Sequence, residues 1–235
     1  MVSVCLASYN GEKYIKEQVQ SILSQLSFND ELIVSDDGSL DNTLRIIEDF
    51  NDPRIKIYHN QDKKGVVGNF ENALKRAKGD YIFLSDQDDV WLPDKVQKCL
   101  QVLNHADLVV TDCLLADSDL NIVSSSFFKL YKSRPGFFRN LWRNTYVGAC
   151  IAFKKQLLDI VLPIPGNLPV YHEGWIASLA DLKGKVVFLN EPLMLFRRHE
   201  TNASFTAGKS GLSIYQKIIY RIKLLYLVIK KLLSL

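Results

Sequence analysis

With 235 residues, the chain is long enough for one large domain, or for one domain with a short appendage. Its hydrophobic content of 47% and charged content of 23% are ordinary for a globular protein with a sizeable core. The net charge of +3 is too small for a typical nucleic-acid-binding surface, so we expect no nucleic-acid partner.

The cysteines and the N-terminus give two further expectations. Cys5, Cys99, Cys113 and Cys150 lie far apart and form no CxxC pair, which argues against a zinc site and a disulfide framework. The chain starts with strand-like residues rather than with the basic and apolar segments of a signal peptide. We therefore expect a cytoplasmic protein.

The first ninety residues alternate between short apolar runs and segments of helical spacing. The apolar runs predict strands at 2–7, 31–35, 54–58 and 81–84. Helices are predicted at 12–26, 42–50 and 69–77. This alternation predicts an α/β fold with a mostly parallel central sheet and helices on both faces.

Polar loops follow three of these four strands. They begin at Ser8, Ser35 and Ser85, and each continues with polar or acidic residues. In open α/β sheets, ligands bind in the crevice beyond the carboxyl ends of the strands. The three loops therefore predict one shared polar site.

The loop after the fourth strand contains three carboxylates within four positions: Asp86, Asp88 and Asp89. Carboxylates this close repel one another, and they stay ionised together only with a cation or several hydrogen-bond donors. Oxygen ligands suit Mg²⁺ or Mn²⁺, which usually arrives bridged to substrate phosphates. The alternative is an acidic turn in which Asp89 or Asp94 caps the next helix.

The second half is less regular. Helices are predicted at 92–103 and 171–181, strands at 108–112, 148–153 and 185–189, and a hairpin turn at 117–121. The aromatic and basic segment 127–142 has no predicted fold. We divide the chain into one domain, 1–205, with halves 1–112 and 113–205, and a tail, 206–235.

Several motifs occur in a fixed order along the chain. They are Ala7-Ser8-Tyr9-Asn10-Gly11, Ser35-Asp36-Asp37-Gly38-Ser39, Asn69-Phe70, Gly79-Asp80-Tyr81, Asp86-Gln87-Asp88-Asp89-Val90-Trp91, Gly148-Ala149-Cys150, His172-Glu173-Gly174-Trp175-Ile176 and Arg197-Arg198-His199-Glu200-Thr201-Asn202. The set resembles the inverting glycosyltransferase family 2, whose GT-A fold is Rossmann-like. The sequence of the loop that contains the three carboxylates, called the carboxylate loop below, resembles that of the rhamnosyltransferase-like branch of bacterial polysaccharide biosynthesis.

The resemblance implies a UDP- or dTDP-sugar site across the polar edge of the sheet, with 1–112 as the nucleotide-binding half and 113–205 as the acceptor-binding half. Tyr9 would stack on the base, and Asp37 would accept a hydrogen bond from its N3–H. Asp88 would bind Mg²⁺ or Mn²⁺, and Asp86 would contact the metal or the ribose. The complete implied donor site is Ala7, Tyr9, Asn10, Asp36, Asp37, Asn69, Asp86, Gln87, Trp175 and Arg198, with Asp88, Asp86 and His199 at the metal.

The resemblance also implies an acidic catalytic base in a His-Asp-x-Trp context. This chain has His172-Glu173-Gly174-Trp175 there, so Glu173 is the candidate base. Its side chain is one methylene longer than that of Asp, and a displacement of about 1 Å can cost on the order of a hundredfold in rate. The alternative is that Glu173 only begins a helix.

The tail from Leu212 onward has the spacing of an amphipathic helix, and no acidic residue follows Glu200. Its longest uninterrupted apolar run, 224–229, is too short to span a bilayer. A basic amphipathic helix suits an anionic membrane surface, here the inner face of the cell membrane, with contact through residues 212–235. Packing on the catalytic domain or pairing with a second subunit are the alternatives.

Together these features predict a metal-dependent inverting glycosyltransferase of the hexosyltransferase type. It would transfer a sugar, with rhamnose as a candidate, to a hydroxyl of a glycan or lipid-linked saccharide in cell-surface polysaccharide synthesis. Two alternatives remain: a synthase that loads a sugar onto polyprenyl phosphate, and a catalytically silent nucleotide-sugar binding module.

Overall fold

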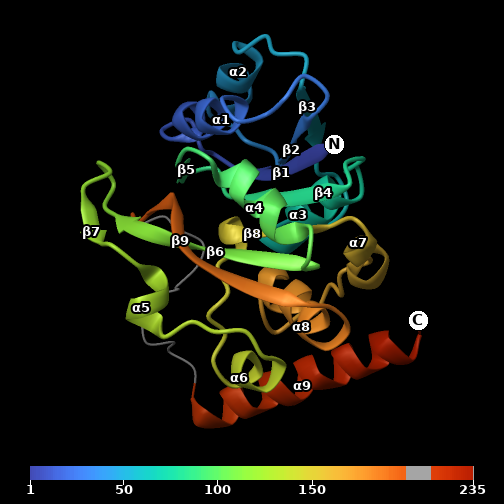
Figure 1. The fold of residues 1–235 in the computed structure, drawn as a ribbon. Helices are drawn as coiled ribbons and strands as arrows, with labels where there is room; N and C mark the ends of the chain where they lie inside the picture. The colour runs from blue at the N-terminus through green and yellow to red at the C-terminus, as the bar shows by residue number, and fades with distance from the viewer. Residues whose placement is uncertain (200–212, 235) are drawn as a thin grey trace.

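The computed structural model describes residues 1–199 and 213–234. A curled central sheet crosses the molecule in the order β3-β2-β1-β4-β8-β6-β9-β5, and β7 pairs with β6 (Figure 1). Helices cover the sheet, so the predicted α/β fold is confirmed.

The first four strands form the parallel half of the sheet. β1 (Val2–Ser8) lies between β2 (Glu31–Asp36) and β4 (Tyr81–Ser85), and β3 (Ile55–His59) pairs with β2. All three pairings are parallel, as predicted. The side chains of β1 and β2 are almost completely buried, which is typical of parallel strands covered on both faces.

The second half makes the sheet more mixed than predicted. β8 (Ile151–Lys154) runs antiparallel to both β4 and β6 (Leu108–Ala116). β6 forms the predicted hairpin with β7 (Ile122–Ser124), and β5 (Val90–Trp91) is a short antiparallel partner of β9.

β9 (Val186–Arg197) is much longer than the predicted strand 185–189. The sequence obscures its second half because Pro192 cannot donate a hydrogen bond within a sheet. In the structure, the register between β6 and β9 shifts at Pro192, and proline is tolerated at such an irregularity. The strand therefore continues to Arg197 and ends beside the carboxylate loop.

The helices are, in chain order, α1 (Ile15–Leu23), α2 (Thr43–Glu48), α3 (Val66–Leu74), α4 (Lys95–Leu103), α5 (Phe127–Tyr131), α6 (Phe137–Trp142), the 3₁₀ turn η1 (Gly148–Cys150), α7 (Gln156–Val161), α8 (His172–Lys183) and α9 (Ile214–Leu233). Of these, α1, α2, α3, α4, α8 and α9 occupy the predicted places with shifted ends, whereas α7 was not predicted and η1 replaces the start of the predicted strand 148–153. The segment 127–142, for which no fold is predicted, thus contains α5 and α6.

The helix-capping role expected of Asp89 or Asp94 in the acidic-turn alternative is wrong. α4 is preceded by Asp94, whose side chain makes no capping hydrogen bond. Asp89 faces the other way, because its Oδ1 accepts a hydrogen bond from the backbone N–H of Arg197 at 3.0 Å.

The tail forms α9, a helix of 20 residues that begins with a capping box between Ser213 and Gln216. It lies along α6 and α8 at the end of the molecule opposite α1 and α2 (Figure 1). Among the described residues, no helix is both long and apolar enough to cross a membrane.

Candidate active site

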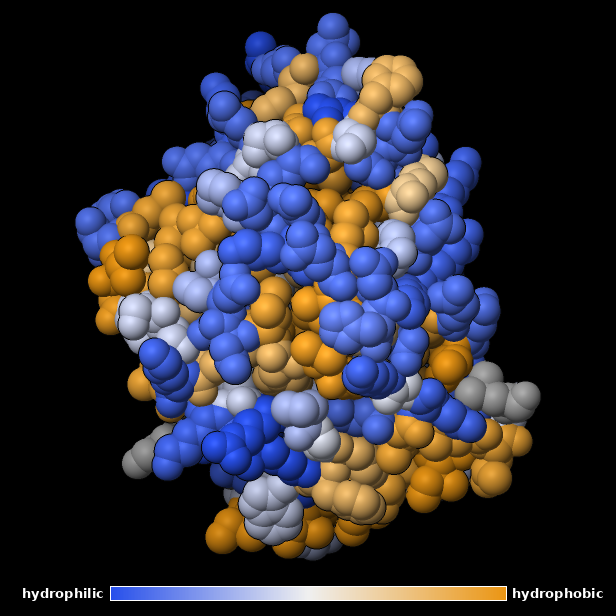
Figure 2. Space-filling view, viewed as in Figure 1, coloured by the Kyte–Doolittle hydropathy of each residue, from blue (hydrophilic) through white to orange (hydrophobic). Residues whose placement is uncertain are grey.

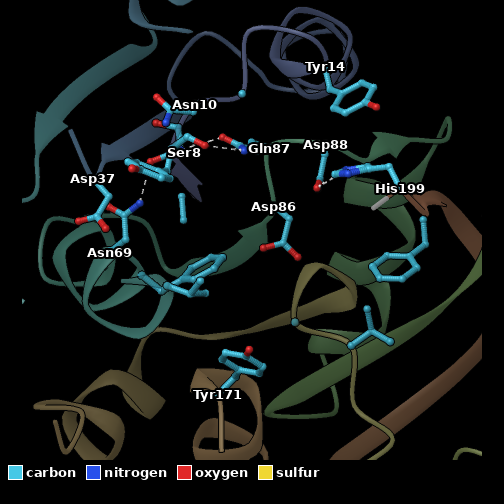
Figure 3. Close-up of a pocket in the computed structure, with 18 of the residues that line it drawn as sticks. Ser8, Asn10, Tyr14, Asp37, Asn69, Asp86, Gln87, Asp88, Tyr171 and His199 are labelled. Atoms are coloured by element: carbon cyan, nitrogen blue, oxygen red, sulfur yellow. Dashed lines mark hydrogen bonds and ion pairs between the residues drawn. The ribbon is translucent and has the colours of Figure 1, made fainter. Parts of the chain in front are cut away.

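The carboxyl ends of β1, β2 and β4 open into one cleft of about 1020 Å³. Figure 3 shows Asp37 and Asn69 on one side, Asp88 and His199 on the other, and Tyr171 facing Asp86 across the open space. The cleft therefore brings together loops that are distant in the sequence. Of the predicted site residues, those that line it are Ala7, Tyr9, Asn10, Asp37, Asn69, Asp86, Gln87, Asp88, Glu173, Arg198 and His199.

The loop after β1 is fixed by the carboxylate loop. The backbone N–H of Tyr9 donates to Oε1 of Gln87 at 2.8 Å, and Nε2 of Gln87 donates to the carbonyl of Tyr9 at 3.0 Å. Gln87 thus uses its amide to hold Tyr9, whose side chain stays 54% exposed at the cleft. A Cβ on Gly11 would lie 2.3 Å from Oε1 of Gln87, so this contact requires glycine there.

Asp37 directly follows β2, and hydrogen bonds hold its carboxylate at the wall of the cleft. Its Oδ1 accepts from Nδ2 of Asn60 at 2.8 Å, and its Oδ2 accepts from the backbone N–H of Gly65 at 2.7 Å. Nζ of Lys64 lies 3.7 Å from Oδ1. Because each carboxylate oxygen can accept more than one hydrogen bond, Asp37 keeps acceptor capacity toward the cleft.

Asn69 and Asn10 shape the same wall. Nδ2 of Asn69 donates to the carbonyl of Ser8 at 3.0 Å, and Oδ1 of Asn69 accepts from the Ser35 hydroxyl at 2.6 Å. Asn10 adopts a left-handed φ of 47°, and its Oδ1 accepts from the backbone N–H of Leu40 at 2.8 Å. Both amides therefore hold the loops beneath a ligand.

Two predicted donor-site residues lie away from the cleft. Asp36 is fully buried, and its carboxylate accepts from the backbone N–H groups of Gly38 and Ser39, so it shapes the loop from below. Trp175 is also fully buried on the inner face of α8, where its indole N–H donates to the carbonyl of Val161 at 2.9 Å. The structure therefore assigns Trp175 to the core, because its ring packs under the helix that carries Glu173.

The three carboxylates after β4 have different surroundings. Burial, together with the neighbouring Asp88, raises the pKa of Asp86 to about 7. Burial and the same repulsion raise the pKa of Asp89 well above its usual range. Oδ2 of Asp89 has no hydrogen-bond partner among the described residues, whereas Oδ2 of Asp88 lies 2.9 Å from Nε2 of His199.

Arg197 fastens the end of β9 to this loop. Its Nε donates to the carbonyl of Asp88 at 2.8 Å, and its Nη1 donates to the carbonyl of Ser118 at 2.7 Å. A further guanidinium nitrogen pairs with Glu17. Arg198 and His199 follow directly and enter the cleft, and the His199 ring stacks on Tyr14 with a centroid distance of 4.8 Å.

Glu173 lies in the first turn of α8 and is almost fully buried. Burial raises its pKa to about 8, and the negative charge of Asp86 contributes in the same direction. Glu173 lines the same cleft as Asp86 and Asp88. A carboxyl group with a pKa near neutrality has the basicity that general-base catalysis favours.

His172, beside it, is a buried imidazole whose pKa burial lowers to about 3, so the ring is neutral at physiological pH. It stacks on Phe70 with a centroid distance of 3.8 Å. Neither ring nitrogen has a hydrogen-bond partner among the described residues, and Nδ1 lies 3.6 Å from Oε2 of Glu173. The geometry thus shows a contact between the two side chains, without the hydrogen bond that would orient the base.

A family model described as "Glycosyl transferase family 2" matches residues 3–161, which include the loops after β1, β2 and β4. The chain is a member of glycosyl transferase family 2. Its activity class is therefore that of a glycosyltransferase, as predicted.

Two curated relatives of this family-2 member cover most of the chain. The UDP-Glc:alpha-D-GlcNAc-diphosphoundecaprenol beta-1,3-glucosyltransferase WfgD of Escherichia coli is 30% identical over 77% of this chain and 70% of its own length. The dTDP-rhamnosyl transferase RfbG of Shigella flexneri is 30% identical over 92% of this chain and 81% of its own length. The rhamnosyltransferase branch is thus one of several to which the chain is similar.

Solved structures show the same fold. Residues 1–349 of S. aureus TarS in complex with UDP superpose with a TM-score of 0.68 at 23% identity, over 84% of this chain and 60% of that one. The mannosyltransferase PcManGT from Pyrobaculum calidifontis, in complex with GDP-Man and Mn²⁺, gives a TM-score of 0.63 at 17% identity, over 97% of this chain and 64% of that one. The chain therefore spans about three fifths of these structures.

The side chains of the family-2 cleft fit a divalent cation in their chemistry. Asp88 and His199 provide adjacent oxygen and nitrogen donors, and Asp86 lies on the same loop. The carboxylate oxygens suit Mn²⁺ and Mg²⁺, and the imidazole nitrogen suits Mn²⁺ better than Mg²⁺. The described residues contain no group of three His, Cys, Asp or Glu arranged as a complete metal site, so substrate oxygens would have to supply further ligands.

Several residues of the family-2 cleft escaped sequence analysis. Tyr14, Lys13, Asp117, Ser118, Tyr146, Val147 and Tyr171 also line it, as do Gly148 and His172 of the quoted motifs. Tyr171 carries the clearest signal, because it lies two positions before the candidate base. The others lie in segments whose spacing gave no sign of approaching the cleft.

Proposed function

We propose that this family-2 enzyme is an inverting glycosyltransferase that moves a sugar from a nucleoside diphosphate to a hydroxyl of a saccharide acceptor. One observation carries the proposal: the buried Glu173 carboxyl shares a single cleft with the Asp86–Asp88 loop. A base on one wall and a site for diphosphate charge on the other are the two requirements of inversion at an anomeric carbon.

In this mechanism, Glu173 accepts the proton of the acceptor hydroxyl as its oxygen attacks the anomeric carbon. The bond from that carbon to the diphosphate breaks on the opposite face, and the nucleoside diphosphate leaves. Burial helps Glu173, because the low local dielectric brings its pKa toward the range in which it can exchange a proton at neutral pH.

The donor wall would bind the nucleotide. Tyr9 presents an exposed ring for stacking on a pyrimidine, and Asp37 presents acceptor capacity for the N3–H shared by uracil and thymine. Asn10, Asn69, Ala7 and Gln87 position the loops, and Arg198 supplies positive charge at the cleft. The donors of the relatives, UDP-Glc and dTDP-rhamnose, fit this preference, with rhamnose as one candidate sugar.

Asp88 and His199, with Asp86 in support, would hold a Mg²⁺ or Mn²⁺ ion that neutralises the charge developing on the departing diphosphate. Burial and the repulsion from Asp88 raise the pKa of Asp86, which supports this assignment, because a bound dication would favour the ionised carboxylate. Arg197 keeps the carbonyl of Asp88 in place beneath the site.

The acceptor would be a glycan or a lipid-linked saccharide in cell-surface polysaccharide synthesis. WfgD, whose printed acceptor is a diphosphoundecaprenol-linked sugar, supports a lipid-linked class. Such a substrate would place the enzyme at the inner face of the cell membrane, in peripheral contact through the segment 212–235, of which residues 213–234 are described.

Binding of UDP and dTDP, measured by thermal shift with and without Mn²⁺, tests the donor site. The wild type is expected to show a shift that increases with Mn²⁺, and Asp88→Ala is expected to lose that increase. Asp49→Ala changes an exposed carboxylate at the end of α2 and serves as the matched control. Folded wild-type protein that responds to no nucleotide would refute the proposal.

A further inference from the structure

α9 turns its apolar stripe away from the protein. Six apolar or aromatic side chains recur at spacings of three and four residues and are all exposed: Tyr215, Ile219, Ile222, Tyr226, Ile229 and Leu233. Figure 2 shows hydrophobic surface along the lower edge of the molecule, where Figure 1 places α9. Monomeric proteins rarely expose a continuous stripe of this kind without a partner for it.

The opposite face of α9 makes the contact with the catalytic domain. Leu224 and Val228 are the buried residues of the helix. Nζ of Lys231 donates to the carbonyl of Leu162 at 2.7 Å. The helix is therefore docked by a narrow inner face, and its broader apolar face remains uncovered.

α6 extends this uncovered surface. Phe138 is 79% exposed and Trp142 is 70% exposed. Arg221 of α9 joins the two helices, because its Nη2 donates to the carbonyl of Trp142 at 2.7 Å and its guanidinium lies 4.0 Å from the Trp142 ring centroid. An exposed Trp beside exposed Ile side chains is typical of a surface that sits at a membrane–water interface.

The charge around these side chains has one sign. The sequence has no Asp or Glu at 120–158, which includes α5 and α6, or at 201–235, which includes α9. Exposed basic residues of the described structure lie on or beside α5 and α6 and on α9: Lys129, Lys132, Arg134, Arg139, Arg143 and Lys230. This distribution complements an anionic surface.

We propose that α6 and α9 together form a membrane-binding surface for anionic lipids. Phe138, Trp142 and the outer stripe of α9 enter the boundary between headgroups and acyl chains, while the exposed Lys and Arg side chains on and beside these helices contact the headgroup phosphates. Pairing of the stripe with a second copy is disfavoured, because it would bring basic helices together without an acidic partner.

The placement of this surface also orients the enzyme. α8, whose first turn carries Glu173, lies against α9. A bound molecule would thus keep its acceptor-binding half close to the bilayer. This step rests on the proposed lipid-linked acceptor, whereas the membrane surface itself stands on the exposed side chains and their charge.

Cosedimentation of the full chain with vesicles tests the proposal. The wild type is expected to pellet with vesicles of phosphatidylcholine and phosphatidylglycerol and to stay in solution with phosphatidylcholine alone. Ile222→Glu combined with Ile229→Glu should weaken the partition by about tenfold or more per site, since each change removes burial of a large apolar side chain. Phe138→Glu should have a similar effect, and Lys223→Gln with Lys230→Gln should cost about fivefold per charge.

Phe28→Glu is the matched control, because Phe28 is 86% exposed in the loop between α1 and β2, far from α9. It should pellet as the wild type does. UDP thermal shift on each variant tests the donor site separately, so failure of the nucleotide site and failure of the membrane surface are distinguishable. Equal pelleting of all variants would overturn the proposal. It would also be overturned if the wild type did not pellet with any vesicles but formed a dimer that the Ile222→Glu and Ile229→Glu changes dissociate.

Discussion

Glu173→Gln should stabilise the protein at alkaline pH while it removes activity. Burial raises the pKa of Glu173 from an ordinary value of 4.5 to about 8. The folded wild type therefore holds a proton that the unfolded chain has released, at every pH between these values. Its free energy of unfolding falls as pH rises through this window, by at most about 1.4 kcal/mol per unit. A neutral Gln avoids this loss, so at pH 8 and above the variant should be more stable by a few kcal/mol.

The same change should lower kcat by about 10²- to 10⁴-fold, because a general base contributes on that order. In the wild type, kcat/KM should rise with pH as Glu173 loses its proton. Urea denaturation between pH 4.5 and pH 9 measures the stability difference, and release of nucleoside diphosphate measures turnover. Glu48→Gln, an exposed change on α2, is the control and should alter neither. A stability difference that does not change with pH, or a variant with wild-type turnover, would refute the reasoning.

Three other substitutions distinguish a residue that stabilises the core from residues of the proposed nucleotide site. Trp175→Phe should destabilise the fold by about 1–3 kcal/mol in urea denaturation, because it leaves the Val161 carbonyl unpaired, yet UDP should bind as before. Tyr9→Ala should weaken UDP binding by about two- to tenfold in calorimetry, through loss of stacking; unchanged affinity would place the base elsewhere. Gln87→Ala removes both hydrogen bonds that hold the Tyr9 backbone, so it should weaken UDP binding with little change in the unfolding midpoint.

The first half of the chain was predictable because its strands and helices alternate with clear spacing. β1 and β4 end at a Ser and β2 ends one residue after a Ser, polar residues follow each, and parallel pairing brings these ends to one edge. The roles of single side chains were less predictable. Asp36 and Asp37 are adjacent in the sequence, but Asp36 is the last residue of the fully buried β2, whereas Asp37 follows the strand and lies at the cleft.

The structure of residues 113–205 depends on contacts between segments that are distant in the sequence, and the spacing of apolar residues does not predict such contacts. β9 continues past Pro192 only because β6 shifts register beside it. Trp175 follows the candidate base by two positions, which on a helix turns it toward the opposite side and into the core. The tail was predicted as an amphipathic helix. Which of its faces contacts the domain depends on the surfaces of α6 and α8, and the sequence of α9 alone does not reveal those surfaces.

The path of Arg197 has a consequence for protein engineering. This residue belongs to the acceptor half by position, yet its guanidinium and backbone N–H bind the carboxylate loop, Ser118 and Glu17 of α1. A chimera that joins residues 1–112 of one relative to the acceptor half of another would therefore separate Arg197 from the loop with which it is matched. Exchange of sugar or acceptor specificity between family members should succeed more often when the last residues of β9 are transplanted together with the donor half.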